Sequence, residues 1–131
     1  MYNHEEYIKR NKPIKKEVVY SDFRLPTIQE LLTLVDYSKR NPASTFGIAS
    51  RSYWSSTISV SSTLSAWYVD FYFGYTSYNK VVARNMYVCC VRDSEHGLQW
   101  SDDAPGTMDW YEAIEYAKNL VAPARGITYD D

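Results

Sequence analysis

The stretch Ala66–Gly74, with the sequence AWYVDFYFG, gives the clearest indication of the fold of this chain. Two sets of side chains alternate along it: Trp67, Val69 and Phe71, and between them Tyr68, Asp70 and Tyr72. Successive side chains of a β-strand point to opposite faces of the sheet, so the alternation predicts a half-exposed strand. We expect the first set to face the core and the second set to face solvent.

Turn and strand signals extend this strand into a small antiparallel sheet. Gly74 marks a turn, and Tyr75–Lys80 is predicted to be the returning strand. Tyr87–Arg92 is predicted to be a further strand, with Val88 and Cys90 on one face. Together these segments predict an antiparallel meander with one face in the core.

The sequence before this sheet predicts less regular structure. Residues 1–13 read as a polar extension, and Ile14–Tyr20 is expected to form a short strand because it contains β-branched residues. Tyr53-Trp54 begins a region of short strands. The Ser/Thr-rich residues 55–65 are expected to form a loop.

Two amphipathic helices are predicted around these strands. Thr27 and Glu30 form a capping box, and apolar residues follow at helical spacing: Ile28, Leu31, Leu32 and Val35. Asn41-Pro42 is expected to end this helix. Asp109 and Glu112 repeat the capping pattern before a second apolar stripe: Trp110, Ala113, Ile114, Ala117 and Leu120. Two such helices with a small antiparallel sheet predict an α+β domain.

Length and composition restrict the classes of function. The 131 residues suit a single domain spanning 1–131. The net charge of −2 argues against nucleic-acid binding, which normally needs clustered excess Lys and Arg. No apolar run approaches the ~18 residues of a membrane span, and the N-terminal residues do not read as a signal peptide. The 13 tyrosines predict many amphipathic rings at a surface, where they make good contact groups.

Residues that could carry catalysis or bind a metal form no recognisable set. Cys89 and Cys90 are adjacent, so their side chains point to opposite faces of a strand and a disulfide is not expected. His4 and His96 are far apart in sequence and have no metal-ligand companions. Asp102-Asp103 reads as a pair of loop charges. We therefore predict no metal, no cofactor and no catalytic residue.

Several motifs in combination resemble one domain family. They are FRLPTIQELLTLVDYSKRNPA (Phe23–Ala43), YWSST (Tyr53–Thr57), AWYVDFYFG (Ala66–Gly74), YVCCVR (Tyr87–Arg92) and GLQWSDDAPGTMDWYEAIEYAKNL (Gly97–Leu120). With these motifs the chain resembles the Lcl C-terminal domain family, named after the C-terminal domain of a bacterial collagen-like protein. That family is similar to the C-type lectin and formylglycine-generating-enzyme folds and includes variable proteins of diversity-generating retroelements. The resemblance implies a C-type-lectin-like fold.

The order of the motifs departs from the family. There, the segment like Gly97–Leu120 normally precedes the one like Phe23–Ala43. The chain is therefore either circularly permuted, which we favour, or spans parts of two tandem copies. The family often has a Cys at the position of Ala117, placed to pair with Cys90, so here Cys90 is expected to be a buried free thiol. Its pattern also has Arg at the position of Cys89, whose loss is expected to remove a surface salt bridge.

The resemblance also separates scaffold residues from variable ones. Fixed positions of the retroelement-linked members correspond here to Trp54, Ala66, Trp67, Val69, Phe71, Gly74, Lys80, Tyr87 and Val88. Residues between them are predicted to bind ligand: Tyr68, Asp70, Tyr72, Phe73, Tyr75, Ser77, Tyr78, Val82, Arg84 and Asn85. A Tyr/Ser-rich exposed surface has the composition of a paratope. The rings could instead pair across strands or be buried in an oligomer interface.

These observations predict a ligand-recognition domain of the retroelement-diversified type, binding a protein or a glycan without catalysis. The motifs of calcium-dependent sugar binding, such as EPN or QPD followed by WND, are absent. Formylglycine-type catalysis needs a differently placed cysteine pair. We expect display on a cell, a virion or a larger assembly. The alternative is a structural or oligomerisation domain of a surface or phage protein, and a homo-oligomer stays open.

Overall fold

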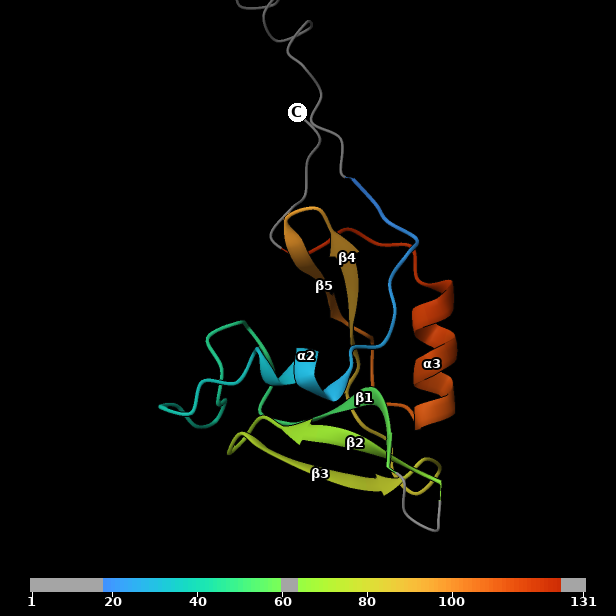
Figure 1. Ribbon diagram of the computed structural model, residues 1–131. Coiled ribbons are helices and arrows are strands. Elements are labelled where there is room, and N and C mark those ends of the chain that lie inside the picture. Colours follow the sequence, from blue (N-terminus) through green and yellow to red (C-terminus); the bar gives the residue numbers. More distant parts are fainter. Residues whose placement is uncertain (1–17, 60–63, 126–131) are drawn as a thin grey trace, which may run out of the picture.

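The computed structural model describes residues 18–59 and 64–125 and has an α+β architecture (Figure 1). Its elements in chain order are α2 (Ile28–Leu32), β1 (Ser52–Ser59), β2 (Ser65–Asp70), β3 (Tyr75–Lys80), β4 (Cys89–Ser94), β5 (Gly97–Asp103) and α3 (Trp110–Asn119). The predicted α+β class is therefore confirmed. None of the helices in the described ranges is long and apolar enough to span a membrane. Residues 1–13 and most of the predicted strand at 14–20 lie outside the described residues.

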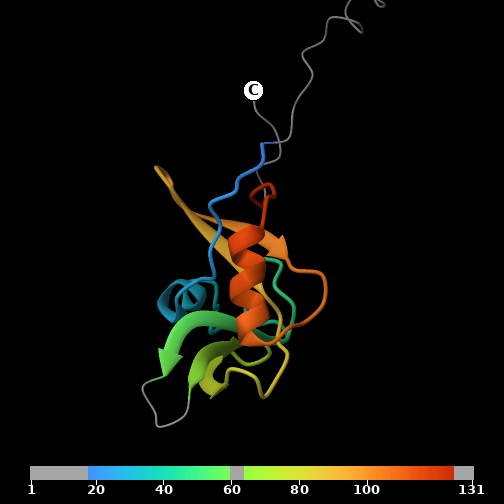
Figure 2. The same ribbon diagram turned by 90° about the vertical axis from the view of Figure 1, so that its right-hand side faces the viewer.

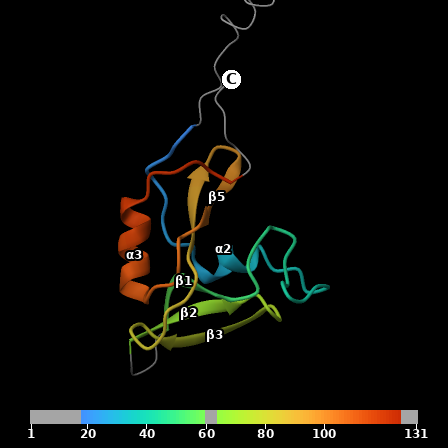
Figure 3. The same cartoon turned by 180° about the vertical axis from the view of Figure 1, so that it is seen from behind.

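The strands form two separate antiparallel sheets. One has the order β1-β2-β3, and the other is the hairpin β4-β5. Figure 3 shows the hairpin standing above the three-stranded sheet, with α3 flanking both. The segment before β4 joins them, because the Tyr87 N–H donates to the Ser52 carbonyl at 2.9 Å and the Trp54 N–H donates to the Tyr87 carbonyl at 3.1 Å.

The single meander predicted from the sequence is wrong. The chain leaves β3 at Val81, and β4 pairs with β5, which had not been predicted as a strand. Only Trp100 and Ser101 are buried in β5, so it lacks an alternating apolar pattern. The predicted pair of loop charges also belongs to β5, where Asp103 accepts a hydrogen bond from the buried Tyr53 hydroxyl at 2.7 Å.

The loop predicted at residues 55–65 is wrong over its first half, since β1 continues to Ser59. Serine favours turns when its hydroxyl competes for nearby backbone groups. Here the buried Ser55 hydroxyl instead donates across the sheet to the Trp67 carbonyl at 2.7 Å. Tertiary pairing therefore stabilises a strand that local composition does not predict.

The two predicted capping boxes are confirmed, but helix α2 is shorter than predicted. In α2 the Thr27 side chain accepts from the Glu30 N–H, and the Glu30 carboxylate accepts from the Thr27 N–H. The helix was predicted to reach Asn41-Pro42, yet after Leu32 it tightens into i→i+3 turns. The chain then turns back, because the Asp36 N–H donates to the Ala43 carbonyl at 2.8 Å. Helix α3 begins at its predicted cap and follows the predicted apolar stripe.

Both faces of β2 are buried by other parts of the chain, whereas the sequence predicted a sheet with one face exposed to solvent. Ala66 and Tyr68 belong to one buried cluster, and Val69 belongs to another, together with the α2 residues Ile28 and Leu31. The first cluster also contains residues from the segment before β4, from β4 itself and from α3: Val81, Met86, Val88, Cys90, Ala113 and Ala117. Figure 2 shows α3 in front of the strands from this side.

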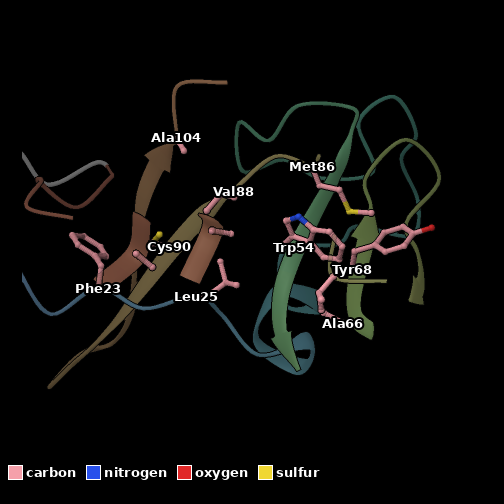
Figure 4. Close-up of a cluster of buried hydrophobic side chains, with 12 residues drawn as sticks. Phe23, Leu25, Trp54, Ala66, Tyr68, Met86, Val88, Cys90 and Ala104 are labelled. Atoms are coloured by element: carbon pink, nitrogen blue, oxygen red, sulfur yellow. The ribbon is translucent and has the colours of Figure 1, made fainter. Parts of the chain in front are cut away.

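The predicted outward orientation of Tyr68 is wrong. Its side chain is 7% exposed, and its ring lies edge-on to Trp54 at a centroid separation of 6.4 Å. Figure 4 shows Tyr68 beside Trp54 and Met86 in the first cluster. The alternation of side chains along β2 holds, but residues 81–88 fold over the face that was expected to meet solvent. Trp67, predicted to be in the core, is only half-buried.

Candidate ligand-binding surface

Nine of the ten predicted ligand-binding residues are exposed or half-exposed, the exception being Tyr68. They do not share one face of the sheet. The register pairs Asp70 with Tyr75 and Trp67 with Tyr78, so Tyr75 and Tyr78 lie on opposite faces of β3. The Tyr78 ring packs edge-on against Trp67 at 5.1 Å. The continuous Tyr/Ser patch expected from the sequence is therefore divided between two faces.

Four of the predicted residues do meet, around a pocket at the end of β2. Its volume is about 390 Å³, and Asp70, Tyr72, Arg84 and Asn85 line it. The remaining lining residues were not among the predicted ligand-binding residues: Ser50, Arg51, Ser52, Met86, Tyr87 and Thr107. The pairing of Tyr87 with Ser52 brings the segments before β1 and before β4 to the same place.

Asp70 organises the side of the pocket that carries the aromatic residues. Its Oδ1 accepts a hydrogen bond from the Tyr72 N–H at 2.7 Å, and its carbonyl accepts one from the Gly74 N–H at 2.8 Å. A hydrogen bond to the Asp70 carboxylate also raises the pKa of the Tyr75 hydroxyl. The carboxylate thus fixes both the turn after β2 and the start of β3.

The turn presents two aromatic rings next to the pocket. Tyr72 is 40% exposed and Phe73 is 55% exposed, and their ring centroids are 4.5 Å apart. The turn is supported from behind, where the Asn41 N–H donates to the Tyr72 carbonyl at 2.9 Å. Gly74 has a φ of +89°, and a Cβ at this position would lie 3.0 Å from Val35 Cγ1. We call Tyr72, Phe73 and Tyr75 the aromatic rim.

A family model described as the Lcl C-terminal domain matches residues 3–92. The chain belongs to the Lcl C-terminal domain family. No curated protein and no solved structure matches. The match includes every residue that lines the pocket except Thr107, and it ends before β5 and α3.

Within this Lcl C-terminal domain, the buried Tyr68 supports the pocket from below. The Arg84 guanidinium carbon lies 5.9 Å from the centroid of the Tyr68 ring, within the range of a cation–π contact. Tyr68 is therefore a packing residue whose ring positions a pocket arginine. Its ring itself is not available to a ligand.

The two cysteines of the Lcl C-terminal domain are buried free thiols on opposite faces of β4. Cys90 is in the cluster with Tyr68, as predicted for a thiol without a partner. Cys89 does not occupy the expected surface position: it is 1% exposed, and its Sγ lies 3.7 Å from Nη2 of Arg125. Burial raises the pKa of each thiol to about 12.

No metal centre is formed by the part of the domain that the structure describes. Within residues 18–59 and 64–125, no three His, Cys, Asp or Glu side chains come together so that they could hold a metal ion. His4 lies outside these ranges, and the exposed His96 imidazole lies 3.3 Å from the carboxylate of the neighbouring Glu95. The chemistry that the pocket offers is hydrogen bonding, charge and aromatic contact.

Proposed function

We propose that this Lcl C-terminal domain recognises a protein or glycan ligand without catalysis, through the pocket and its aromatic rim. Family membership indicates a ligand-binding or surface-associated domain. The observation that carries the proposal is that Asp70, Tyr72, Arg84 and Asn85, singled out from the sequence, line one pocket. Such a site would combine polar groups inside the pocket with exposed rings beside it.

The hydrogen bonds made by Tyr72 and Tyr75 of the rim support binding over a passive role. Tyr72 and Tyr75 are held through Asp70, and the backbone of Tyr72 is held through Asn41. Exposed rings that are already ordered lose little conformational entropy when a ligand binds. Large aromatic side chains left exposed on a fixed turn are typical of an interaction site.

A C-type-lectin-like fold and a retroelement-diversified origin belong to the same proposal. Nine of the ten residues that correspond to variable positions of retroelement-linked relatives meet solvent at least in part. Five of the nine scaffold positions are fully buried: Trp54, Ala66, Val69, Phe71 and Val88. Trp67 and Tyr87 are half-buried, and Lys80 is exposed. A diversified binding surface requires a mostly buried frame and an exposed set of variable residues.

The absence of catalysis is proposed from the site itself. A nucleophilic cysteine needs a lowered pKa and access to substrate, and both thiols have the opposite properties. The pocket contains a carboxylate and two arginines, but Asp70 is already engaged by Tyr72 and Tyr75.

Arrays of peptides and glycans, probed with the whole chain, test the proposal. Binding to any array member should be lost in the double variant Tyr72→Ser/Tyr75→Ser. The control is Tyr111→Ser, which removes a tyrosine of similar exposure, 50%, from helix α3 and outside the pocket lining. If the wild type binds and the double variant binds equally well, the site is wrong.

A second candidate function is assembly, in which the rim is buried between subunits. Phe73 and Val82, which are 55% and 67% exposed, favour it, because apolar side chains at this exposure are suited to a subunit interface. The two functions predict different effects of the rim variant on molecular mass.

A further inference from the structure

The arginines of the domain differ in whether they have a carboxylate partner. Arg24, Arg92 and Arg125 each form an ion pair, with N–O distances of 2.7, 2.6 and 3.4 Å to Glu30, Asp22 and Asp103. In the described ranges, the remaining arginines form none: Arg40, Arg51 and Arg84. Two of these three line the pocket.

The one carboxylate of the pocket does not neutralise these two arginines. Asp70 makes no contact within 4.0 Å with either guanidinium, and its Oδ1 accepts from the Tyr72 N–H. The Arg51 guanidinium donates only to the neighbouring Ser50 carbonyl, at 3.0 Å, and the Arg84 guanidinium lies over the Tyr68 ring. The pocket therefore carries more positive than negative charge, with guanidinium N–H groups left to bind a further group.

A guanidinium is matched to a carboxylate, because its planar fork donates two parallel hydrogen bonds to the two oxygens. The surroundings indicate where that carboxylate would come from. Tyr72, Phe73 and Tyr75 form a rim of exposed rings beside the pocket, and such aromatic rings are what paratopes use against proteins. An acidic side chain would enter the pocket while its neighbours lie on the rings.

We propose that Arg51 and Arg84 bind an aspartate or glutamate side chain of a protein ligand. This inference rests on the proposed function, since it specifies the group that enters the same pocket. Asn85 and Thr107 line the pocket as well and offer hydrogen bonds to the backbone beside the anchoring acid. Arginine anchors near the centre of an interface commonly carry much of its binding energy.

Selection of a displayed random peptide library on the whole chain tests the anchor. Enriched peptides should share an Asp or Glu, and changing that residue to the matching amide should weaken binding at least tenfold. The double variant Arg51→Gln/Arg84→Gln should weaken binding at least tenfold, and Arg84→Lys should weaken it less. Lys118→Gln, which removes an exposed cation from α3, should stay within twofold. Thermal unfolding establishes that each variant is folded.

Three results would overturn the anchor, and they differ in what they say of the proposed function. If the selected peptides bind the arginine double variant as tightly as the wild type but lose binding to Tyr72→Ser/Tyr75→Ser, the acidic anchor is refuted and the recognition surface stands. If the peptides bind both double variants as tightly as the wild type, the recognition surface is refuted as well. Arginine-dependent binding of an oligosaccharide containing glucuronic acid, with no acidic peptide enriched, would assign the site to a glycan carboxylate.

Discussion

Tyr20 and Ala122 form an antiparallel pair, in which the Tyr20 N–H donates to the Ala122 carbonyl at 2.8 Å and the Ala122 N–H donates to the Tyr20 carbonyl at 3.1 Å. The first and last described parts of the chain therefore lie side by side (Figure 1). Neighbouring ends are what a circular permutation requires, because one connection can replace the other with little change to the fold. We propose circular permutation as the reason for the changed order of the motifs, and this contact is the geometry that it requires.

A permuted chain that starts at Gly97 should fold. It would join residue 131 to residue 1 and open the turn between β4 and β5, where Glu95 and His96 are exposed. We expect cooperative unfolding, with a loss of about 1–2 kcal/mol from opening one hairpin. Urea unfolding followed by circular dichroism measures this loss. The matched control opens the same circle between Tyr68 and Val69 and should not fold, and a Gly97 variant that also fails to fold would contradict the account.

Truncation should destabilise the protein much more at Tyr68 than at Tyr72. Tyr68→Ala removes a buried ring and should lower the free energy of unfolding by about 3 kcal/mol. Tyr72→Ala removes a ring that is 40% exposed and should cost less than about 1 kcal/mol. Chemical denaturation gives both values. Similar losses for the two variants would mean that the 81–88 segment does not cover Tyr68.

Gly74 should tolerate alanine less well than Gly106. Both have positive φ, +89° and +83°, which costs an L-residue about 1–2 kcal/mol. Only at Gly74 would the new Cβ meet neighbours, at 3.0 Å from Val35 and 3.2 Å from Ala43. We expect Gly74→Ala to lower the free energy of unfolding by about 1 kcal/mol more than Gly106→Ala does. Equal losses would show that the turn does not pack against Val35.

Cys89 and Cys90 should resist alkylation in the folded protein. Burial raises the pKa of both thiols to about 12, so the reactive thiolate is scarce at pH 8 as well as inaccessible. Iodoacetamide labelling followed by mass spectrometry should proceed only at the rate of unfolding and become fast in denaturant. Rapid labelling of either residue in the native state would show an accessible, reactive thiol and contradict the argument for the absence of catalysis.

Local sequence signals predicted those features that depend on nearby residues. The two capping boxes, the returning strand at Tyr75–Lys80 and the common face of Val88 and Cys90 were all predicted, and the structure confirms them. Each depends on residue types a few positions apart or on the alternation of one strand.

The features that were missed depend on contacts between distant segments. Tyr68 is buried because residues 81–88 cross its face, and Arg51 joins the site because Ser52 pairs with Tyr87. Strand periodicity gives the two faces of β2 but not what covers them. That is why four of the predicted binding residues line one pocket, whereas Tyr75 and Tyr78, predicted to share one patch, lie on opposite faces.

Light scattering of the wild type and of Tyr72→Ser/Tyr75→Ser, in line with size-exclusion chromatography, tests most directly whether the rim is free for a ligand. One chain weighs 15.2 kDa. A free recognition surface predicts that both proteins have the same mass, whatever that mass is. An oligomer of the wild type that the double variant converts to monomer would contradict the account and make the rim an assembly interface.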